Sequence, residues 1–161
     1  MPLVTGRASE RGVNLFEVAT EARSGRSDGY HSPAVRVGPL LGAAALGASV
    51  YDLETGQSIC PYHYEHGNEE WLLVLAGRPT LRHPAGEDEL QPWDVVCFPE
   101  GPEGAHKVTN HSGAPARVIL LSTKRKPAVS IYPDSGKVAV VPPGKLFRLA
   151  DEVDYWDGEQ E

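Results

Sequence analysis

A chain of 161 residues, 40% of them apolar, is long enough to bury the core of one folded domain. Its formal net charge of −7 excludes the usual nucleic-acid-binding proteins, because binding the phosphate backbone needs clustered lysines and arginines. The 17 glycines and 14 prolines favour short elements joined by turns over long helices.

The sequence predicts a cytoplasmic protein that does not enter a membrane. Residues 1–12 lack the apolar core of a signal peptide. The most apolar stretch, residues 40–50, is too short to span a bilayer. The two cysteines, Cys60 and Cys97, give no disulfide framework, and we expect both to be buried, reduced thiols.

In chain order, three parts are predicted. Residues 1–33 form a polar, glycine-rich arm, residues 34–141 form a β-barrel, and residues 142–161 form an acidic tail. The barrel is inferred from short β-type runs separated by turn residues, which together are typical of an all-β sandwich or barrel. The predicted strands are 35–37, 44–53, 59–64, 71–75, 79–82, 95–98, 106–109, 116–122, 129–131 and 138–141.

The chemistry is concentrated in two segments of this β region. In residues 59–65, His63 and Glu65 share one strand face, because side chains alternate along a strand. A turn then returns the chain to Glu70, and a separate segment supplies His106. Two imidazoles with one or two carboxylates predict a site for one divalent transition metal such as Zn, Fe, Mn, Ni or Co.

These two segments resemble the two motifs of the cupin superfamily. In the first motif, His63 takes the first histidine position, Glu70 is the glutamate, and Gly77 follows at the family's spacing. In the second, a Pro-Glu-Gly turn at 99–101 precedes His106, with an asparagine at position 110. The resemblance covers residues 35–122 and implies a single-domain cupin-type β-barrel, also called a double-stranded β-helix or jelly roll.

The sequence departs from the family pattern at three places. Glu65 stands where the family has its second histidine, and Trp93 replaces the glycine that opens the second motif. The loop from Gly101 to His106 is two residues longer than the pattern. We expect Glu65 to complete the metal site, because the alternative, His66, is one residue out of register and needs a β-bulge to reach it.

The resemblance leaves two classes of function open, since barrels of this kind host many activities. One is a metal-dependent enzyme, of isomerase, epimerase or dioxygenase type, acting on a small polar metabolite such as a sugar, sugar phosphate or keto acid. The other is a non-catalytic small-molecule-binding or accessory protein whose metal site has decayed.

A homodimer is also predicted. The outward side of residues 71–75 carries Trp71, Leu73 and Leu75, which is more apolar surface than a solvated strand usually exposes. An N-terminal arm that covered this face in its own chain would instead leave a monomer.

Overall fold

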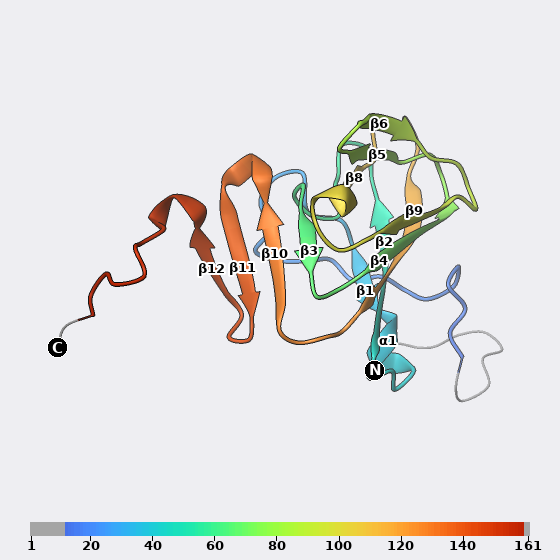
Figure 1. The fold of residues 1–161 in the computed structure, drawn as a ribbon. Coiled ribbons are helices and arrows are strands. Elements are labelled where there is room, and N and C mark those ends of the chain that lie inside the picture. The colour runs from blue at the N-terminus through green and yellow to red at the C-terminus, as the bar shows by residue number, and fades with distance from the viewer. Residues whose placement is uncertain (1–11, 160–161) are drawn as a thin grey trace.

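The protein, described by a computed structural model for residues 12–159, is built almost entirely from antiparallel β-strands. Figure 1 shows a barrel-like body formed by the early and middle strands, and an extension made by the last strands. None of the helices among the described residues is long and apolar enough to cross a membrane.

One wall of the barrel is a five-stranded sheet in the order β1-β2-β9-β4-β7. The strands are β1 (Ala34–Arg36), β2 (Leu46–Leu53), β4 (Glu70–Ala76), β7 (Val95–Phe98) and β9 (Ala116–Thr123). A short helix, α1 (Val37–Leu40), lies between β1 and β2, where the sequence predicted only strand and turn.

The opposite wall consists of two smaller sheets. The first has the order β6-β5-β8, with β5 (Thr80–His83), β6 (Gly86–Glu89) and β8 (Lys107–Thr109). The second has the order β12-β11-β10-β3, with β3 (Tyr64–His66), β10 (Ala128–Tyr132), β11 (Lys137–Val141) and β12 (Lys145–Arg148). Three 3-10 turns, η1 (Pro102–Gly104), η2 (Pro133–Ser135) and η3 (Leu149–Asp151), complete the elements.

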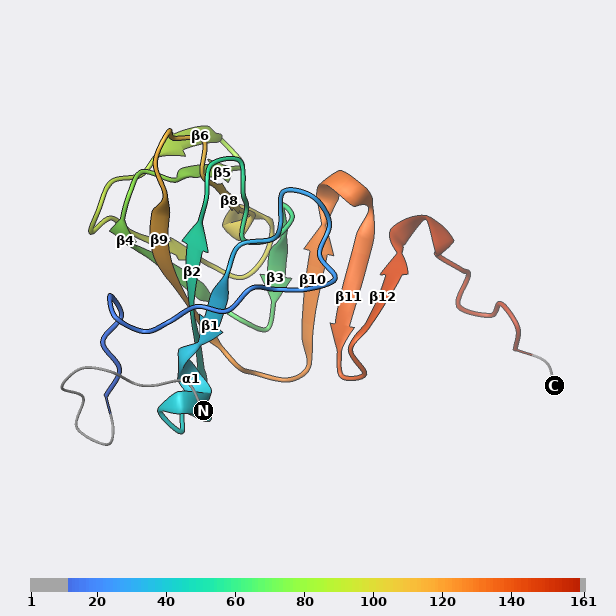
Figure 2. The ribbon, with the colours of Figure 1, turned by 180° about the vertical axis from the view of Figure 1, so that it is seen from behind.

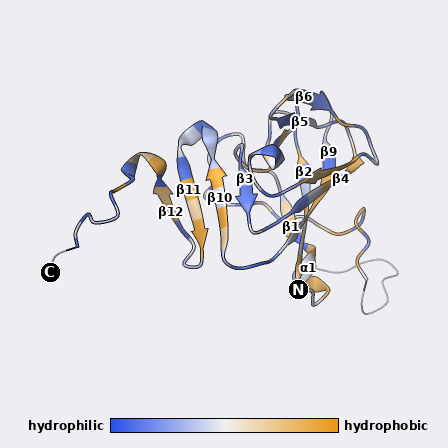
Figure 3. Ribbon diagram, in the orientation of Figure 1, coloured by the Kyte–Doolittle hydropathy of each residue, from blue (hydrophilic) through white to orange (hydrophobic). Residues whose placement is uncertain are grey.

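The sequence placed residues 142–161 entirely in a tail, but β12 pairs with β11 within that range. The sheet therefore continues to Arg148. The prediction missed this strand because its apolar run is only Leu146 and Phe147, whereas the pairing comes from backbone hydrogen bonds. The strand β6 was missed for a similar reason: its residues are all exposed and mostly acidic, and Figure 3 shows the strand as strongly hydrophilic.

The hydrophobic core lies between the walls and contains inward-facing residues of β2, β4, β5, β7, β8 and β9. On β4, Leu72 and Val74 are fully buried in it and share a face with Glu70. The alternation predicted for this strand is confirmed, since Trp71 lies on the opposite face and is 46% exposed. Cys60 packs at the edge of this core, but Cys97 is exposed, contrary to the prediction, because it alternates with the inward-facing Phe98.

The described part of the N-terminal arm covers the outer face of the five-stranded sheet, which it crosses in Figure 2. Val13, Leu15 and Val18 pack against a cluster that includes Leu75 and the half-buried Leu73. Arg117 on β9 holds the arm by donating hydrogen bonds to its backbone carbonyls. The arm therefore covers most of the apolar face that the sequence assigned to a dimer contact, while residues 1–11 lie outside the described part.

A glycine is required at position 77, where β4 ends and the chain turns. The residue has φ of +79°, a conformation that side chains disfavour. A Cβ atom there would lie 2.5 Å from the Cα atom of Ala116 on β9. The glycine of the first motif thus allows β4 to turn away while remaining packed against β9.

The asparagine of the second motif, Asn110, has a structural role. It is fully buried, and its amide donates hydrogen bonds to the carbonyl oxygens of Leu53 and Ala114 at 2.7 and 2.8 Å. Its side-chain oxygen accepts hydrogen bonds from the backbone and hydroxyl of Ser112. These bonds tie the turn after β8 to the end of β2.

We expect Asn110→Ala to lower the free energy of unfolding by about 3 kcal/mol, because it leaves buried carbonyl groups without their donor. Urea denaturation followed by circular dichroism would measure this change. The exposed neighbour His111 provides the matched control, and His111→Ala should be close to neutral. Equal stability of the two variants would show that the asparagine does not hold the turn.

Candidate metal centre

The two histidines of the candidate site are brought together by backbone pairing. His63 and His106 form an isolated antiparallel bridge, in which each backbone N–H donates to the carbonyl of the other, at 3.1 and 2.8 Å. This bridge joins the segment before β3 to the segment before β8. The imidazole rings consequently lie with their centroids 4.7 Å apart.

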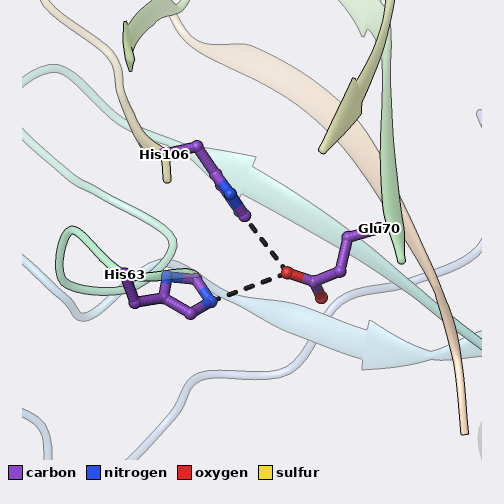
Figure 4. A group of neighbouring side chains, drawn as sticks. All are labelled: His63, Glu70 and His106. Atoms are coloured by element: carbon purple, nitrogen blue, oxygen red, sulfur yellow. Dashed lines mark ion pairs between the residues drawn. The ribbon is translucent and has the colours of Figure 1, made fainter. Parts of the chain in front are cut away.

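Glu70 approaches the two rings from the opposite wall, at the first position of β4. Its Oε2 atom lies 3.6 Å from Nε2 of His63 and 3.5 Å from Nε2 of His106, as Figure 4 shows. All three residues are at least nine-tenths buried. Among the described residues they form the only group of three metal-ligating side chains whose ligand atoms lie within 4.8 Å of one another.

Both rings are oriented by backbone carbonyls on their far side. Nδ1 of His63 lies 3.0 Å from the carbonyl oxygen of Pro61, and Nδ1 of His106 lies 2.9 Å from that of Gly104. A carbonyl can only accept, so each Nδ1 must carry a proton and donate it. The Nε2 atoms that face Glu70 are then the ring nitrogens that could hold a metal, as in sites where a second hydrogen bond sets the tautomer.

The donor set fits a metal ion. Two atoms of the cluster, Oε2 of Glu70 and Nε2 of His106, are buried without a hydrogen-bond partner among the described residues. Buried polar atoms are rarely left in this state. Ligand atoms about 2.0–2.2 Å from a tetrahedral metal lie roughly 3.3–3.6 Å apart, which matches the observed separations of 3.5 and 3.6 Å from Oε2 to the two nitrogens.

The pKa values of the two histidines are shifted in opposite directions. Burial lowers the pKa of His63, but hydrogen bonding and charge from Cys60 and Glu70 outweigh burial and raise it. Burial and the charge on His63 lower the pKa of His106 to about 4. A metal ion that binds these rings must displace any proton held on Nε2, because only the unprotonated nitrogen can coordinate a metal.

Aromatic rings pack against both histidines and limit their movement. Phe98 of β7 stacks on His106 with an interplanar angle of 7°. Tyr132, at the end of β10, stacks on His63 with an interplanar angle of 19° and a centroid distance of 5.7 Å. The sequence analysis did not identify Tyr132 as part of the site, because it lies on a strand far along the chain from both motifs.

Glu65 lies beside the cluster but is not one of the three grouped residues. Its Oε1 atom accepts a hydrogen bond of 3.0 Å from the hydroxyl of Ser130, which is paired with it across β3 and β10. Burial and then the Glu70 carboxylate raise the pKa of the Glu65 carboxyl group. His66 is exposed, and its ring contacts Tyr64 edge-on. Neither side chain belongs to the three-residue cluster, and a role of Glu65 as a further ligand stays a prediction.

The longer loop of the second motif forms the 3-10 turn η1, which supplies the carbonyl that orients His106. Gly104 in this turn packs so closely that a Cβ atom would overlap the carbonyl oxygen of Pro99. The longer loop, which departs from the family pattern, therefore helps to position His106. Trp93, which replaces the motif glycine, adopts φ of 76°, a conformation that glycine adopts at little cost.

Comparison with known proteins agrees with this geometry. The family described as "Cupin domain" matches residues 49–122, which include all three clustered residues and both segments that carry them. This match identifies the fold of residues 49–122 as a cupin barrel. The all-β barrel is the cupin fold predicted from the two motifs, and the predicted resemblance is confirmed.

Two solved structures are similar over most of the chain. A proposed sugar phosphate isomerase from Acidithiobacillus ferrooxidans has a TM-score of 0.78 at 23% identity, covering 87% of this chain and 91% of its own. A sugar phosphate isomerase of a cupin superfamily from Silicibacter pomeroyi has a TM-score of 0.77 at 22% identity, covering 91% and 98%.

A third structure, the polyketide cyclase RemF from Streptomyces resistomycificus, is similar over a smaller part. Its TM-score is 0.58 at 21% identity, covering 73% of this chain and 82% of its own. No curated protein sequence matches the chain. At these identities the similarities establish the fold and leave the reaction to be inferred from the site.

Proposed function

We propose that this cupin is a metal-dependent isomerase of a small sugar-type metabolite, with one divalent transition metal held by His63, Glu70 and His106. The proposal depends on one observation: two Nε2 atoms and one carboxylate oxygen lie close together in a buried cluster. Two of these three atoms, Oε2 of Glu70 and Nε2 of His106, have no hydrogen-bond partner among the described residues. A metal in such a site polarises a carbonyl or hydroxyl oxygen of the substrate. The two solved cupins described as sugar phosphate isomerases support this choice of reaction.

Isomerisation needs a group that removes a proton from one carbon and returns it to the neighbouring carbon. Glu65 is suited to this role in the proposed site. It follows His63 by two residues in an extended segment, so the two side chains are expected on the same face, and Glu65 is half-buried. The hydroxyl of Ser130 orients the carboxylate by donating a hydrogen bond to Oε1 of Glu65.

Deuterium exchange tests the proposed reaction whichever sugar is the product. Metal-loaded protein would be incubated in D₂O with a panel of aldose and ketose phosphates, and the sugars would then be measured by NMR. We expect deuterium beside the carbonyl carbon of at least one sugar, with no exchange after chelator treatment. Binding of a sugar without exchange would favour the alternative, a non-catalytic small-molecule-binding cupin.

We also propose that the chain forms a homodimer through the free edge of its last strand. In the four-stranded sheet β12 is the terminal strand, and its Leu146 and Phe147 are 58% and 49% exposed. Edge strands of this kind pair readily with a second copy, and two-fold pairing is the commonest symmetry in soluble oligomers.

Light scattering of the purified chain should give twice the monomer mass of 17.4 kDa at micromolar concentration. Leu146→Lys should shift this mass towards the monomer, while Leu40→Lys, an equally non-polar-to-charged change at another exposed leucine, should not. A monomer mass for the unmodified chain would exclude the dimer.

A further inference from the structure

One half-buried arginine of the N-terminal arm, Arg23, has a side-chain nitrogen that lacks a hydrogen-bond partner among the described residues. Arg23 follows the bridge between Glu21 and Ala34 at the edge of β1. Its guanidinium carbon lies 5.5 Å from the ring centroid of Tyr51, a β2 residue packed against the barrel core. Its Nη1 atom is buried and has no hydrogen-bond partner among residues 12–159.

Arg117, a partly buried arginine on the five-stranded sheet, offers a comparison for the hydrogen bonding of Arg23. Arg117 pairs with Asp52 at 3.0 Å and also donates to carbonyls of the arm. Even the more exposed Arg82 forms a two-pronged pair with Asp134. An arginine is always charged, and a buried N–H without an acceptor costs free energy, so the Arg23 position favours an anionic ligand that supplies the acceptor.

Arg23 also lines a pocket of about 220 Å³ between the arm and the segment before β3. Arg26 lies on its arm side, and Ile59 and Cys60 lie on its barrel side. None of the described residues that line the pocket is acidic, although the whole chain carries a net charge of −7. The pocket is therefore a locally cationic place in an acidic protein.

One residue that lines this pocket contacts the candidate metal centre from behind, at the Nδ1 side of the His63 ring. The Sγ atom of Cys60, which lines the pocket, lies 3.6 Å from Nδ1 of His63. Tyr51 on β2 lies near both the pocket and the metal centre. Burial and the charges of Cys60 and Glu70 raise the pKa of its hydroxyl, whereas the charge of Arg23 lowers it. Both Arg23 and Glu70 thus act electrostatically on one tyrosine hydroxyl.

We propose that Arg23 binds the phosphate group of the substrate, with Arg26 at the pocket rim and the sugar directed towards the metal centre. The proposal rests on the proposed function, because it takes the substrate to be a phosphorylated sugar. A guanidinium group suits this role, since its N–H donors match two phosphate oxygens at once. The opposite charges of the phosphate and the two arginines add to this fit.

The test measures binding by titration calorimetry of the full chain after chelator treatment, so that no metal contributes. Inorganic phosphate, ribose 5-phosphate and ribose are the probes. Arg23→Gln should weaken binding of both phosphate compounds by about ten- to a hundredfold, the effect of losing a charged hydrogen bond. Arg36→Gln removes the same charge from an exposed position on β1 and should leave both affinities unchanged.

Equal phosphate affinity in the two variants, or no phosphate binding by the unmodified chain, would overturn the proposal. Binding of inorganic phosphate that ribose 5-phosphate does not displace would show a site for free phosphate and would also overturn it. If Arg23→Gln abolishes binding of ribose 5-phosphate but no sugar exchanges deuterium, the phosphate site stands and the isomerase function fails.

Discussion

The variant carrying both His63→Ala and His106→Ala should lose its metal while keeping its β-type circular dichroism. We expect one divalent transition metal per chain in the unmodified protein and background levels in the double variant. Losing a single supporting partner of a metal ligand already costs about ten- to a hundredfold in affinity, and this change removes two ligands outright. Elemental analysis of protein purified without an affinity tag would measure the loss.

The control for this experiment is His66→Ala. His66 lies three residues from His63 and is exposed, and it is not part of the buried cluster. Its removal should leave the metal content unchanged. If the double variant retained its metal, or if His66→Ala lost it, the metal would be bound elsewhere and the assignment of His63, Glu70 and His106 would be wrong.

The second large effect is expected from Glu65→Gln. If Glu65 transfers the proton, this change should lower kcat for the exchanging sugar by about 10²- to 10⁴-fold, the usual contribution of a positioned acid or base. The glutamine retains the size of the side chain and can keep its contact with Ser130. Metal content should stay unchanged, because the clustered ligand atoms come from three other residues.

Glu69→Gln is the matched control, since Glu69 is an exposed glutamate whose carboxylate accepts a hydrogen bond from the indole of Trp71. It should leave kcat and metal content unchanged. Loss of the metal in Glu65→Gln would instead support the hypothesis made from the sequence, in which Glu65 is a fourth ligand. Unchanged turnover would exclude it as the proton-transferring group.

Much of the candidate site follows from local sequence pattern. Period-two alternation places Glu70, Leu72 and Val74 on one face of a strand, and the structure has this face in the core. The spacing of His63, Glu70 and His106 indicated the cupin motifs because both segments match together. Strand faces and short motifs can be predicted from sequence since they depend on neighbours within a few residues.

Register between distant segments was decided only by the tertiary structure. Glu65 follows His63 by two residues, and the sequence predicted that both side chains lie on one strand face. Pairing of β3 with β10 instead gives the Glu65 carboxylate a hydrogen-bond partner in Ser130, 65 residues away. The same pairing brings Tyr132 onto His63. No local pattern contains such partners, because backbone hydrogen bonds between strands carry no signature in the side chains that they align.

By itself, the sequence determined an all-β barrel and the three residues that meet at its buried centre, because alternation and motif spacing are local properties of the chain. The tertiary structure decided that the arm covers its own sheet through Val13, Leu15 and Val18, and that Nη1 of Arg23 is buried without an acceptor among residues 12–159. In the sequence Arg23 is one of several arginines in a polar, glycine-rich stretch. Its Nη1 atom becomes buried only when folding brings the arm against β2 and the segment before β3, which removes the water that would otherwise accept its hydrogen bond.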